Sequence, residues 1–371
     1  MSTIKTNAIL DASGGNTTTI NGTTPTAYNT MGKNRIINGA MEIDQRNAGA
    51  SVTPTSDVYT LDRWQAVRSQ NNLSVQQVTD APAGFNNSLK VTANSGATIG
   101  SADYWYVRHP IEGYNVADCN FGTADAATFT LSFWVKGSVT GSYSVGFHST
   151  QGAGETAYLA TYTINSANTW EYKTITVDGQ TSGPWNKTNS QGLVLFFNLG
   201  VGSAFGTTTT DSWITGWYPG LTTGVQFAAN ASATIQFTGV QLEVGSVATE
   251  FERRPFGYEL GLCQRYFTKS DNYDTVPGTG SREELAIYAG LIANAHTQGN
   301  VNFPVEMRAQ PTLVFYHPSS GASNQIGYYG DAGTVYYVNI SRKNTKGITE
   351  VIATTSVSEC ARFHFTASAE L

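Results

Sequence analysis

Charge and cysteine are both scarce in this chain of 371 residues. Asp, Glu, Lys and Arg make up 13% of it, the net charge is −6, and no basic run occurs. Nucleic-acid binding therefore lacks its electrostatic footprint and is not expected. The three cysteines, Cys119, Cys263 and Cys360, are far apart and form no CxxC pair. They indicate neither a zinc site nor a disulfide framework, and free thiols fit folding in a reducing cytosol.

Long apolar runs and catalytic motifs are also lacking. No stretch approaches the roughly 18 apolar residues of a membrane span, and the N-terminal MSTIKTNAILDASGG has no apolar core. We therefore expect neither membrane insertion nor a signal peptide. The sequence holds no GxSxG or HExxH motif and no β-helix repeat, and its scattered carboxylates form no evident glycosidase pair. We expect no enzyme, no cofactor and no metal.

What the chain has in abundance is the composition of a β-protein. Aromatic residues make up 12% of it, and it has 38 glycines. Apolar and polar residues alternate over 128–136, 142–147 and 170–177, while 193–199 is almost continuously apolar. Such short strands between Gly and Asn turns predict an all-β fold with a β-sandwich, specifically a jelly roll, over residues 34–254.

The pattern changes period near the end of this domain. Residues 235–242 alternate as a strand does, whereas Phe256, Leu260, Cys263 and Phe267 follow a helical spacing after Pro255. We expect a short linking helix over 255–267 and a second, distal β-sandwich over 268–371. Residues 1–33 are rich in threonine and cannot build a core alone. They are either a disordered tail or a docking arm.

Two groups of motifs resemble a phage tail-fibre family, notably fibres of cyanobacterial and other marine phages. The opening motifs are 34–42 (NRIINGAME), 44–49 (DQRNAG) and 62–64 (DRW), and the closing motifs are 239–245 (GVQLEVG), 249–254 (TEFERR) and 263–267 (CQRYF). The first 22 residues and 303–312 (FPVEMRAQPT) resemble the start and the distal domains of the same proteins. The resemblance implies a carbohydrate-binding-module-like jelly roll in a structural protein of the virion.

The resemblance also implies partners and a location. Such fibres are homotrimers that dock to a tail adaptor or nozzle protein through the N-terminal segment, here 1–33, and assemble in the host cytoplasm. Their distal domains, here 268–371, recognise a host surface polysaccharide or lipopolysaccharide. Related jelly rolls often hold a structural calcium ion, and Glu42 and Glu243 stand at the matching positions. We interpret these carboxylates as surface groups or hydrogen-bond acceptors, and assign no metal.

Two sets of residues are candidates for binding. For the trimer interface they are Phe256, Leu260, Cys263 and Phe267, which could alternatively pack on their own chain. Sugar rings stack on aromatic planes, and the glycan-binding candidates are the aromatics of Gly-, Ser- and Thr-rich loops: Trp185, Trp213, Trp217, Tyr218, Tyr328, Tyr329, Tyr336 and Tyr337. These could instead fill cores, as we expect of Trp64 and Trp134. A capsid decoration or cement protein, or another tail protein without receptor binding, is the alternative function.

Overall fold

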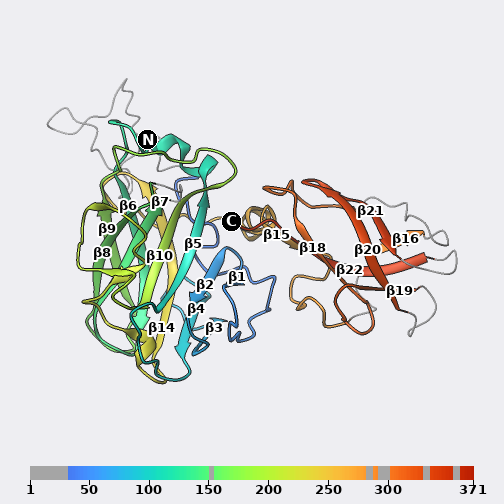
Figure 1. Ribbon diagram of the computed structural model, residues 1–371, viewed down its shortest axis with the longest axis horizontal. Helices are drawn as coiled ribbons and strands as arrows, with labels where there is room; N and C mark the ends of the chain where they lie inside the picture. The colour runs from blue at the N-terminus through green and yellow to red at the C-terminus, as the bar shows by residue number, and fades with distance from the viewer. Residues whose placement is uncertain (1–31, 150–153, 281–286, 291–300, 329–334, 354–359) are drawn as a thin grey trace, which may run out of the picture.

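A computed structural model describes residues 32–149, 154–280, 287–290, 301–328, 335–353 and 360–371. Two β units lie side by side along the long axis of the molecule and meet at a narrow waist (Figure 1). Within the described residues the only α-helix is α1 (Phe256–Gln264), and two short 3-10 helices, η1 (Gly113–Cys119) and η2 (Phe227–Ala229), accompany the strands. The all-β prediction is confirmed. No helix in the described part of the chain is long and apolar enough to span a membrane.

The first unit is a sandwich of two antiparallel sheets. The five-stranded sheet has the order β3 (Leu73–Val78), β4 (Ser88–Ala93), β14 (Thr234–Val244), β6 (Phe129–Gly137) and β9 (Glu171–Val177). The seven-stranded sheet has the order β1 (Val58–Leu61), β2 (Trp64–Arg68), β5 (Tyr104–Glu112), β10 (Gln191–Val201), β7 (Gly141–Ser149), β8 (Thr156–Ile164) and β12 (Trp213–Thr215). A small parallel pair, β11 (Gly206–Thr207) and β13 (Gly220–Leu221), accompanies it.

The alternation of β6 explains how the two sheets meet. Leu131, Phe133 and Val135 are fully buried, because successive side chains of a strand point to opposite faces and these three face the other sheet. The Phe133 ring lies 5.0 Å from that of Phe197 on β10, which stacks at 4.3 Å on Phe237 of β14. Trp64 is fully buried in the same core, as predicted.

The second unit is organised around one strand, β22 (Cys360–Ser368). Four strands pair with it. β15 (Phe267–Lys269) and β18 (Thr312–Tyr316) pair with its C-terminal part, and β16 (Ile287–Gly290) and β19 (Gln325–Tyr328) with its N-terminal part. The sheet continues through β20 (Val335–Asn344), β21 (Gly347–Ala353) and β17 (Val301–Asn302). Phe303, Phe315, Phe363 and Phe365 are buried in its core, which is separate from that of the first unit.

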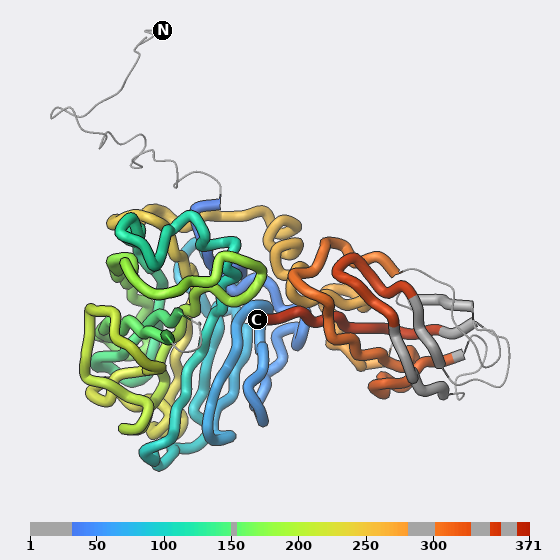
Figure 2. The backbone as a smooth tube through the Cα atoms, turned by 45° about the horizontal axis from the view of Figure 1, so that its top comes forward, coloured from blue at the N-terminus to red at the C-terminus, as the bar shows by residue number. Residues whose placement is uncertain are grey.

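Charged side chains hold the two units together at the waist, where α1 lies (Figure 2). Glu112, at the end of β5, accepts a bidentate pair from Arg265 at 2.9 and 2.6 Å and a third bond from the Tyr266 hydroxyl at 2.7 Å. Glu370 forms ion pairs with both Arg46 and Arg63 of the first unit. Buried pairs of this geometry fix orientation, because losing one partner leaves an uncompensated charge.

The linking helix is shorter than predicted, and this bears on the trimer candidates. Phe267 lies in β15 rather than on the helix, 6% exposed, with the Arg46 guanidinium 3.8 Å above its ring. Cys263 is fully buried within its own chain, in a cluster with Tyr266. Both side chains pack within their own chain, the alternative that the sequence left open, and a role for them in a trimer interface stays a prediction. Leu260 is partly buried in the same cluster, whereas Phe256 is 51% exposed.

Candidate functional site

An open groove of about 650 Å³ lies on the outer face of the five-stranded sheet. Its floor is formed by Ser132 and Trp134 of β6, Tyr172 of β9 and Gly239 of β14. Trp134 has the opposite parity to the buried Phe133, so the strand fills the core with one set of side chains and directs the other set to the outer face of the sheet, where Trp134 and Lys136 are partly exposed. The groove follows from the alternation of β6.

Two aromatic rings stand next to each other on this floor. Trp134 and Tyr172 are direct partners across the β6–β9 pair, and their ring centroids are 5.4 Å apart. Tyr172 is 44% exposed, an unusual degree of solvent contact for a large aromatic side chain in the middle of a strand. Adjacent rings offer a stacking surface to the C–H face of a sugar. The Ser132 side chain is buried, and the Thr249 hydroxyl donates to Glu243 and accepts from Lys33. The polar groups left to a ligand are those of Tyr172, Glu250 and Arg253.

The walls of the groove come from two connections outside the sheet. Phe85 belongs to the connection between β3 and β4, and Phe251 to the segment that follows β14. Their rings meet edge to face at 5.2 Å, and the guanidinium of Arg253 lies 4.8 Å from the centre of the Phe85 ring. Arg253 is itself exposed. The two connections therefore support each other, and they leave one cation at the rim.

Gly239 allows these rings to come together over the floor. Its φ is 59°, and a Cβ atom there would lie 2.6 Å from the Phe85 ring and 3.1 Å from that of Trp134. The register of the β14–β6 pair shifts between Thr238 and Gln241, so the strand bulges at this point. Glycine is required twice over, by the backbone conformation and by the close approach.

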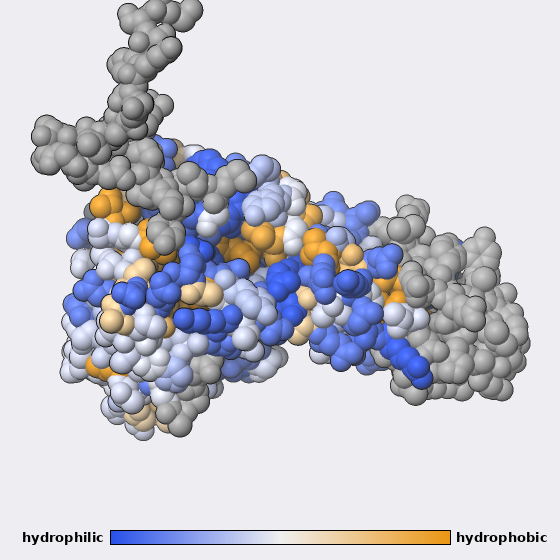
Figure 3. Space-filling model, turned by 90° about the horizontal axis from the view of Figure 1, so that it is seen from above, coloured by the Kyte–Doolittle hydropathy of each residue, from blue (hydrophilic) through white to orange (hydrophobic). Residues whose placement is uncertain are grey.

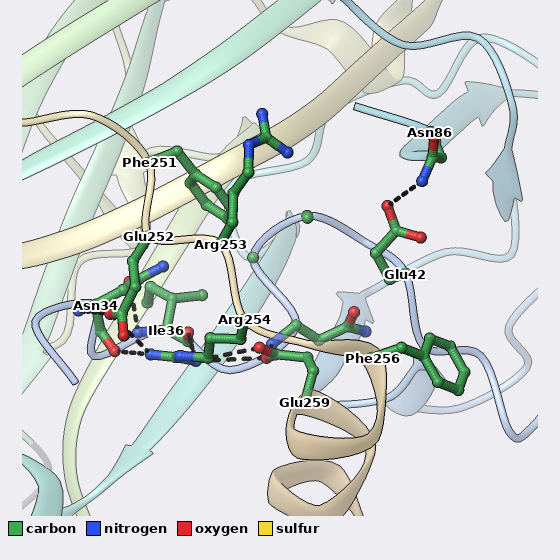
Figure 4. A pocket seen from close by; sticks show the side chains of 13 residues that line it. Asn34, Ile36, Glu42, Asn86, Phe251, Glu252, Arg253, Arg254, Phe256 and Glu259 are labelled. Atoms are coloured by element: carbon green, nitrogen blue, oxygen red, sulfur yellow. Dashed lines mark hydrogen bonds and ion pairs between the residues drawn. The ribbon is translucent and has the colours of Figure 1, made fainter. Parts of the chain in front are cut away.

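A second hollow of about 330 Å³ adjoins the groove and shares Phe251 and Arg253 with it (Figure 4). The segment 249–254 runs between the groove and this hollow, and its successive side chains alternate between two environments. Glu252 accepts bonds from the backbone N–H of Gly32 and Asn34, both at 2.7 Å. Arg254 donates to the backbone oxygens of Asn34 and Ile36 and pairs with Glu252 and Glu259. Alternate residues thus bind the opening segment, while Phe251 and Arg253 face the hollows.

The predicted loop tryptophans do not lie in this groove. Trp185 packs on Phe121 at 4.7 Å and perpendicular to Trp213 at 5.6 Å, and both tryptophans lie partly buried against the sandwich core. The indole N–H of Trp213 donates to the backbone oxygen of Asp178 at 2.8 Å. They form one cluster at the edge of the sandwich, as packing side chains.

Trp217 and Tyr218 lie on the outer face of the other, seven-stranded sheet. The Trp217 ring contacts Tyr104 at 5.3 Å and Phe205 at 5.1 Å, and the cluster below it contains the buried Phe196. The Nε2–H of His148 donates to the backbone oxygen of Tyr218 at 3.1 Å, and burial lowers the pKa of this histidine to about 4. These aromatics cover the sheet, so their main contacts are with the chain itself.

The tyrosines predicted in the second unit are described only as backbone. Gln325 pairs with Tyr337 and Ile326 with Tyr336 across β19 and β20, and Tyr328 ends β19. The side chains of Tyr328, Tyr336 and Tyr337, and the whole of Tyr329, lie outside the described residues. Their role in glycan binding stays a prediction.

Sequence reasoning missed the groove because it assigned Trp134 to the core. That assignment is wrong, since Trp134 lines the open groove and is only partly buried. The parity of β6 is a signal that could have found it, because three consecutive core positions alternate with Ser132, Trp134 and Lys136. Phe85, Tyr172, Phe251 and Arg253 reach the same place only through long-range pairing.

The carboxylates considered for calcium are held by the protein itself. Glu243 accepts bonds from the backbone N–H and hydroxyl of Thr249 and from the Gln241 amide, and Glu42 accepts from Asn86 and Asn87. Within the described part of the chain no group of three or more His, Cys, Asp or Glu residues could hold a metal ion. The two carboxylates act as hydrogen-bond acceptors.

No known protein-family profile matches the chain, and no curated protein matches it. Among solved structures, the enzymatically active domain of bacteriophage CBA120 tailspike protein 4 is 17% identical with a TM-score of 0.33, over 57% of this chain and 22% of that chain. A structure described as CBM4 is 14% identical with a TM-score of 0.32, over 57% of this chain and 99% of that one. The CBM22-2 xylan-binding domain from Paenibacillus barcinonensis Xyn10C is 14% identical with a TM-score of 0.29, over 49% of this chain and 92% of that one. Similarities this distant carry no functional argument, which has to come from the groove.

Proposed function

We propose that this chain is a carbohydrate-binding structural protein, and that its groove over β6 and β9 binds a polysaccharide or lipopolysaccharide of a host cell surface. One observation carries the proposal. Trp134, half-buried, and Tyr172, exposed, stand side by side on a sheet face, between aromatic walls and with Arg253 at the rim. Aromatic planes beside hydrogen-bonding groups match the alternating apolar and hydroxyl faces of sugar rings.

The surroundings of the groove favour a sugar over an apolar protein segment. The surface of the molecule seen from above is mostly hydrophilic, with hydrophobic side chains in small separate patches (Figure 3). Tyr172 presents a polar hydroxyl at the end of its ring, and Glu250 and Arg253 give the groove further polar atoms. An interface for an apolar partner would have a larger continuous patch.

The wider role that we propose is attachment of a virion to its host, as a tail fibre without catalytic activity. It rests on the opening and closing motifs, which resemble those of phage tail fibres. The chain would act as a homotrimer in the virion, assembled in the host cytoplasm and docked to a tail adaptor through residues 1–33. Phe256 and Tyr258 of α1, 51% and 55% exposed, are available to a neighbouring subunit. Three weak sites on one fibre would give avidity that a single site lacks.

The test of sugar binding is calorimetric titration of the full chain with a panel of purified bacterial surface polysaccharides. We expect saturable binding by the wild type and loss of at least tenfold in affinity in Trp134→Ala, because stacking anchors of this kind dominate small binding sites. Tyr114→Ala is the matched control, since Tyr114 is 60% exposed but lies in η1 away from the groove. Equal losses in both variants, or undiminished binding by Trp134→Ala, would contradict the assignment of the groove.

A further inference from the structure

We propose that the groove selects an acidic polysaccharide, with Arg253 binding the carboxylate of a uronic-acid residue while a neighbouring sugar stacks on Trp134 and Tyr172. The inference rests on the proposed function and names the ligand class of the same site. Arg253 lines both the groove and the adjoining hollow, so a chain of sugars passing from one to the other would run along its side chain. In Figure 4 its guanidinium points away from Arg254 and Glu259.

The charge of Arg253 is uncompensated by the protein. It makes no ion pair and no hydrogen bond to any of the described residues, and its guanidinium contacts only aromatic rings and lies near Gly84. The other arginines nearby are all paired: Arg254 with Glu252 and Glu259, Arg35 with Asp118, Arg265 with Glu112, and Arg46 and Arg63 with Glu370. Among these arginines, all within the described residues, Arg253 is the one without an acidic partner.

The way Arg253 is held suits a carboxylate better than a hydroxyl group. The guanidinium lies 4.8 Å from the ring centre of Phe85 and 5.9 Å from that of Phe251, which restrains the side chain. A restrained planar fork of N–H donors matches the two oxygens of a carboxylate, and less entropy is lost on binding than for a free lysine. A neutral sugar would use only single donors of the same group.

Acidic residues on this path have to be weighed. Glu252 and Glu259 line the adjoining hollow but pair with Arg254. Glu42, also in the hollow, accepts among the described residues only from neutral amides and opposes an anion there, and Glu250 lines the groove itself.

Glu250 is exposed, and only its backbone oxygen is bonded, to Lys33 and Gln241. Its carboxylate is free to turn into solvent, whereas Arg253 is restrained against the wall. Glu250 therefore weakens the attraction for an acidic sugar without cancelling it, and Glu250→Gln should raise affinity for such a ligand.

The experiment compares acidic polymers with their neutral counterparts. Polygalacturonate and alginate, each in native and carboxyl-reduced form, are titrated into the full chain at constant ionic strength. We expect the wild type to bind at least one native acid polymer about tenfold more tightly than its reduced form, as a charge-assisted bidentate contact would give. Arg253→Gln should remove this preference while keeping affinity for the reduced polymer, and Arg253→Lys should restore only part of it.

A charge control separates the local contact from the net charge. Lys187→Gln removes one positive charge from an exposed position outside the groove, and it should leave the preference intact. If the wild type binds neutral polymers as tightly as acidic ones and Arg253→Gln changes nothing, the acidic preference is overturned and sugar binding stands. If none of the polymers binds, and the polysaccharide panel of the previous test is also negative, the proposed function itself fails.

Discussion

The outer faces of the two sheets in the first unit both carry aromatic side chains, but they use them differently. On the seven-stranded sheet, Tyr106 and Phe196 are buried under a cover that includes Trp217. On the five-stranded sheet, Trp134 and Tyr172 remain accessible at the bottom of a groove. The same kind of residue on the same kind of strand therefore serves packing on one face and leaves a ligand surface on the other.

The difference originates in the connections that cross each face. Phe205, Trp217 and Tyr218 belong to the connections around β11, β12 and β13, and they contact the seven-stranded sheet directly. The segment after β14 contacts the five-stranded sheet through polar groups. It bonds to Gln241 and Glu243, and its backbone oxygens accept from Thr130 and Thr176. Beyond the bulge at Gly239 the face stays open. Trp134 and Tyr172 therefore keep accessible ring surface on this face, which the proposed function assigns to a ligand.

The largest expected effect is a difference in stability between one variant on each face. Trp217→Ala should lower the free energy of unfolding by about 2 to 3 kcal/mol, because it removes a partly buried cover from an apolar cluster. Trp134→Ala should cost less, about 1 kcal/mol, because its ring packs on the exposed Tyr172 rather than on a buried apolar cluster. Urea denaturation monitored by circular dichroism measures both. If Trp134→Ala is the more destabilising of the two, the comparison of the faces is wrong.

The next effect is a pH dependence of stability that originates on the outer face of the seven-stranded sheet. Burial lowers the pKa of His148 from 6.5 to about 4. The unfolded chain therefore takes up the proton first on acidification, so the contribution of His148 to stability is complete above about pH 6.5 and is lost as pH falls toward 4. Between pH 7 and pH 5 the loss should be about 2 kcal/mol, measured by urea denaturation at each pH.

The control for this prediction is the difference between the wild type and His148→Gln. Burial also lowers the pKa of His109, which adds a loss of the same sign. Burial raises the pKa of Asp62 to about 6, so its contribution acts in the opposite sense, and stability falls as pH rises from about 4 to 6. Both terms cancel in the difference. If the free energy of unfolding changes with pH equally in both proteins, His148 does not contribute to the pH dependence.

A smaller effect is expected at the floor of the groove. Gly239→Ala should destabilise the fold by about 1 kcal/mol through its positive φ, and reduce sugar affinity several-fold because the new methyl group displaces the Phe85 ring. Gly49→Ala is the matched control, since Gly49 has φ 79° and open space around it. It should show the backbone cost alone, and reduced affinity in both variants would argue against the ring contact.

The smallest effect concerns the hydroxyl group of the exposed tyrosine. Tyr172→Phe keeps the stacking ring and should reduce sugar affinity by less than about fivefold, the value of one solvent-exposed neutral hydrogen bond. Tyr172→Ala should reduce it much further. Calorimetric titration with the same polysaccharide ranks the two variants, and equal losses would mean that the hydroxyl rather than the ring is recognised.

Much of the fold could be read from local pattern. The alternation over 128–136 and 170–177 corresponds to β6 and β9, and that over 235–242 to β14. The helix predicted over 255–267 ends too late. Phe267 fits the helical spacing by coincidence, but it already belongs to β15, where its backbone pairs with Ser368 of β22. Local periodicity cannot show where a distant strand begins to compete for the chain.

The candidate site was harder to predict, for a similar reason. Composition points to aromatic residues in loops, but Trp185 and Trp213 pack against each other and Trp217 covers a sheet. Whether an aromatic side chain is covered depends on which connection crosses its face, and that depends on contacts between residues far apart in sequence. Phe85 and Phe251 illustrate this, since they meet across 166 positions, 251 minus 85.

The alternating segment 249–254 has a consequence for how such a protein could change its target. Glu252 and Arg254 are bound to the opening segment, and altering them would disturb the fold. Phe251 and Arg253 alternate with them along the chain. These two face the hollows and make few contacts that the sandwich needs. Under the proposed function, mutation could therefore change the preferred sugar at every second position of one short stretch while selection for folding holds the others constant. Host range would then evolve along a single extended segment, without redesign of the domain beneath it.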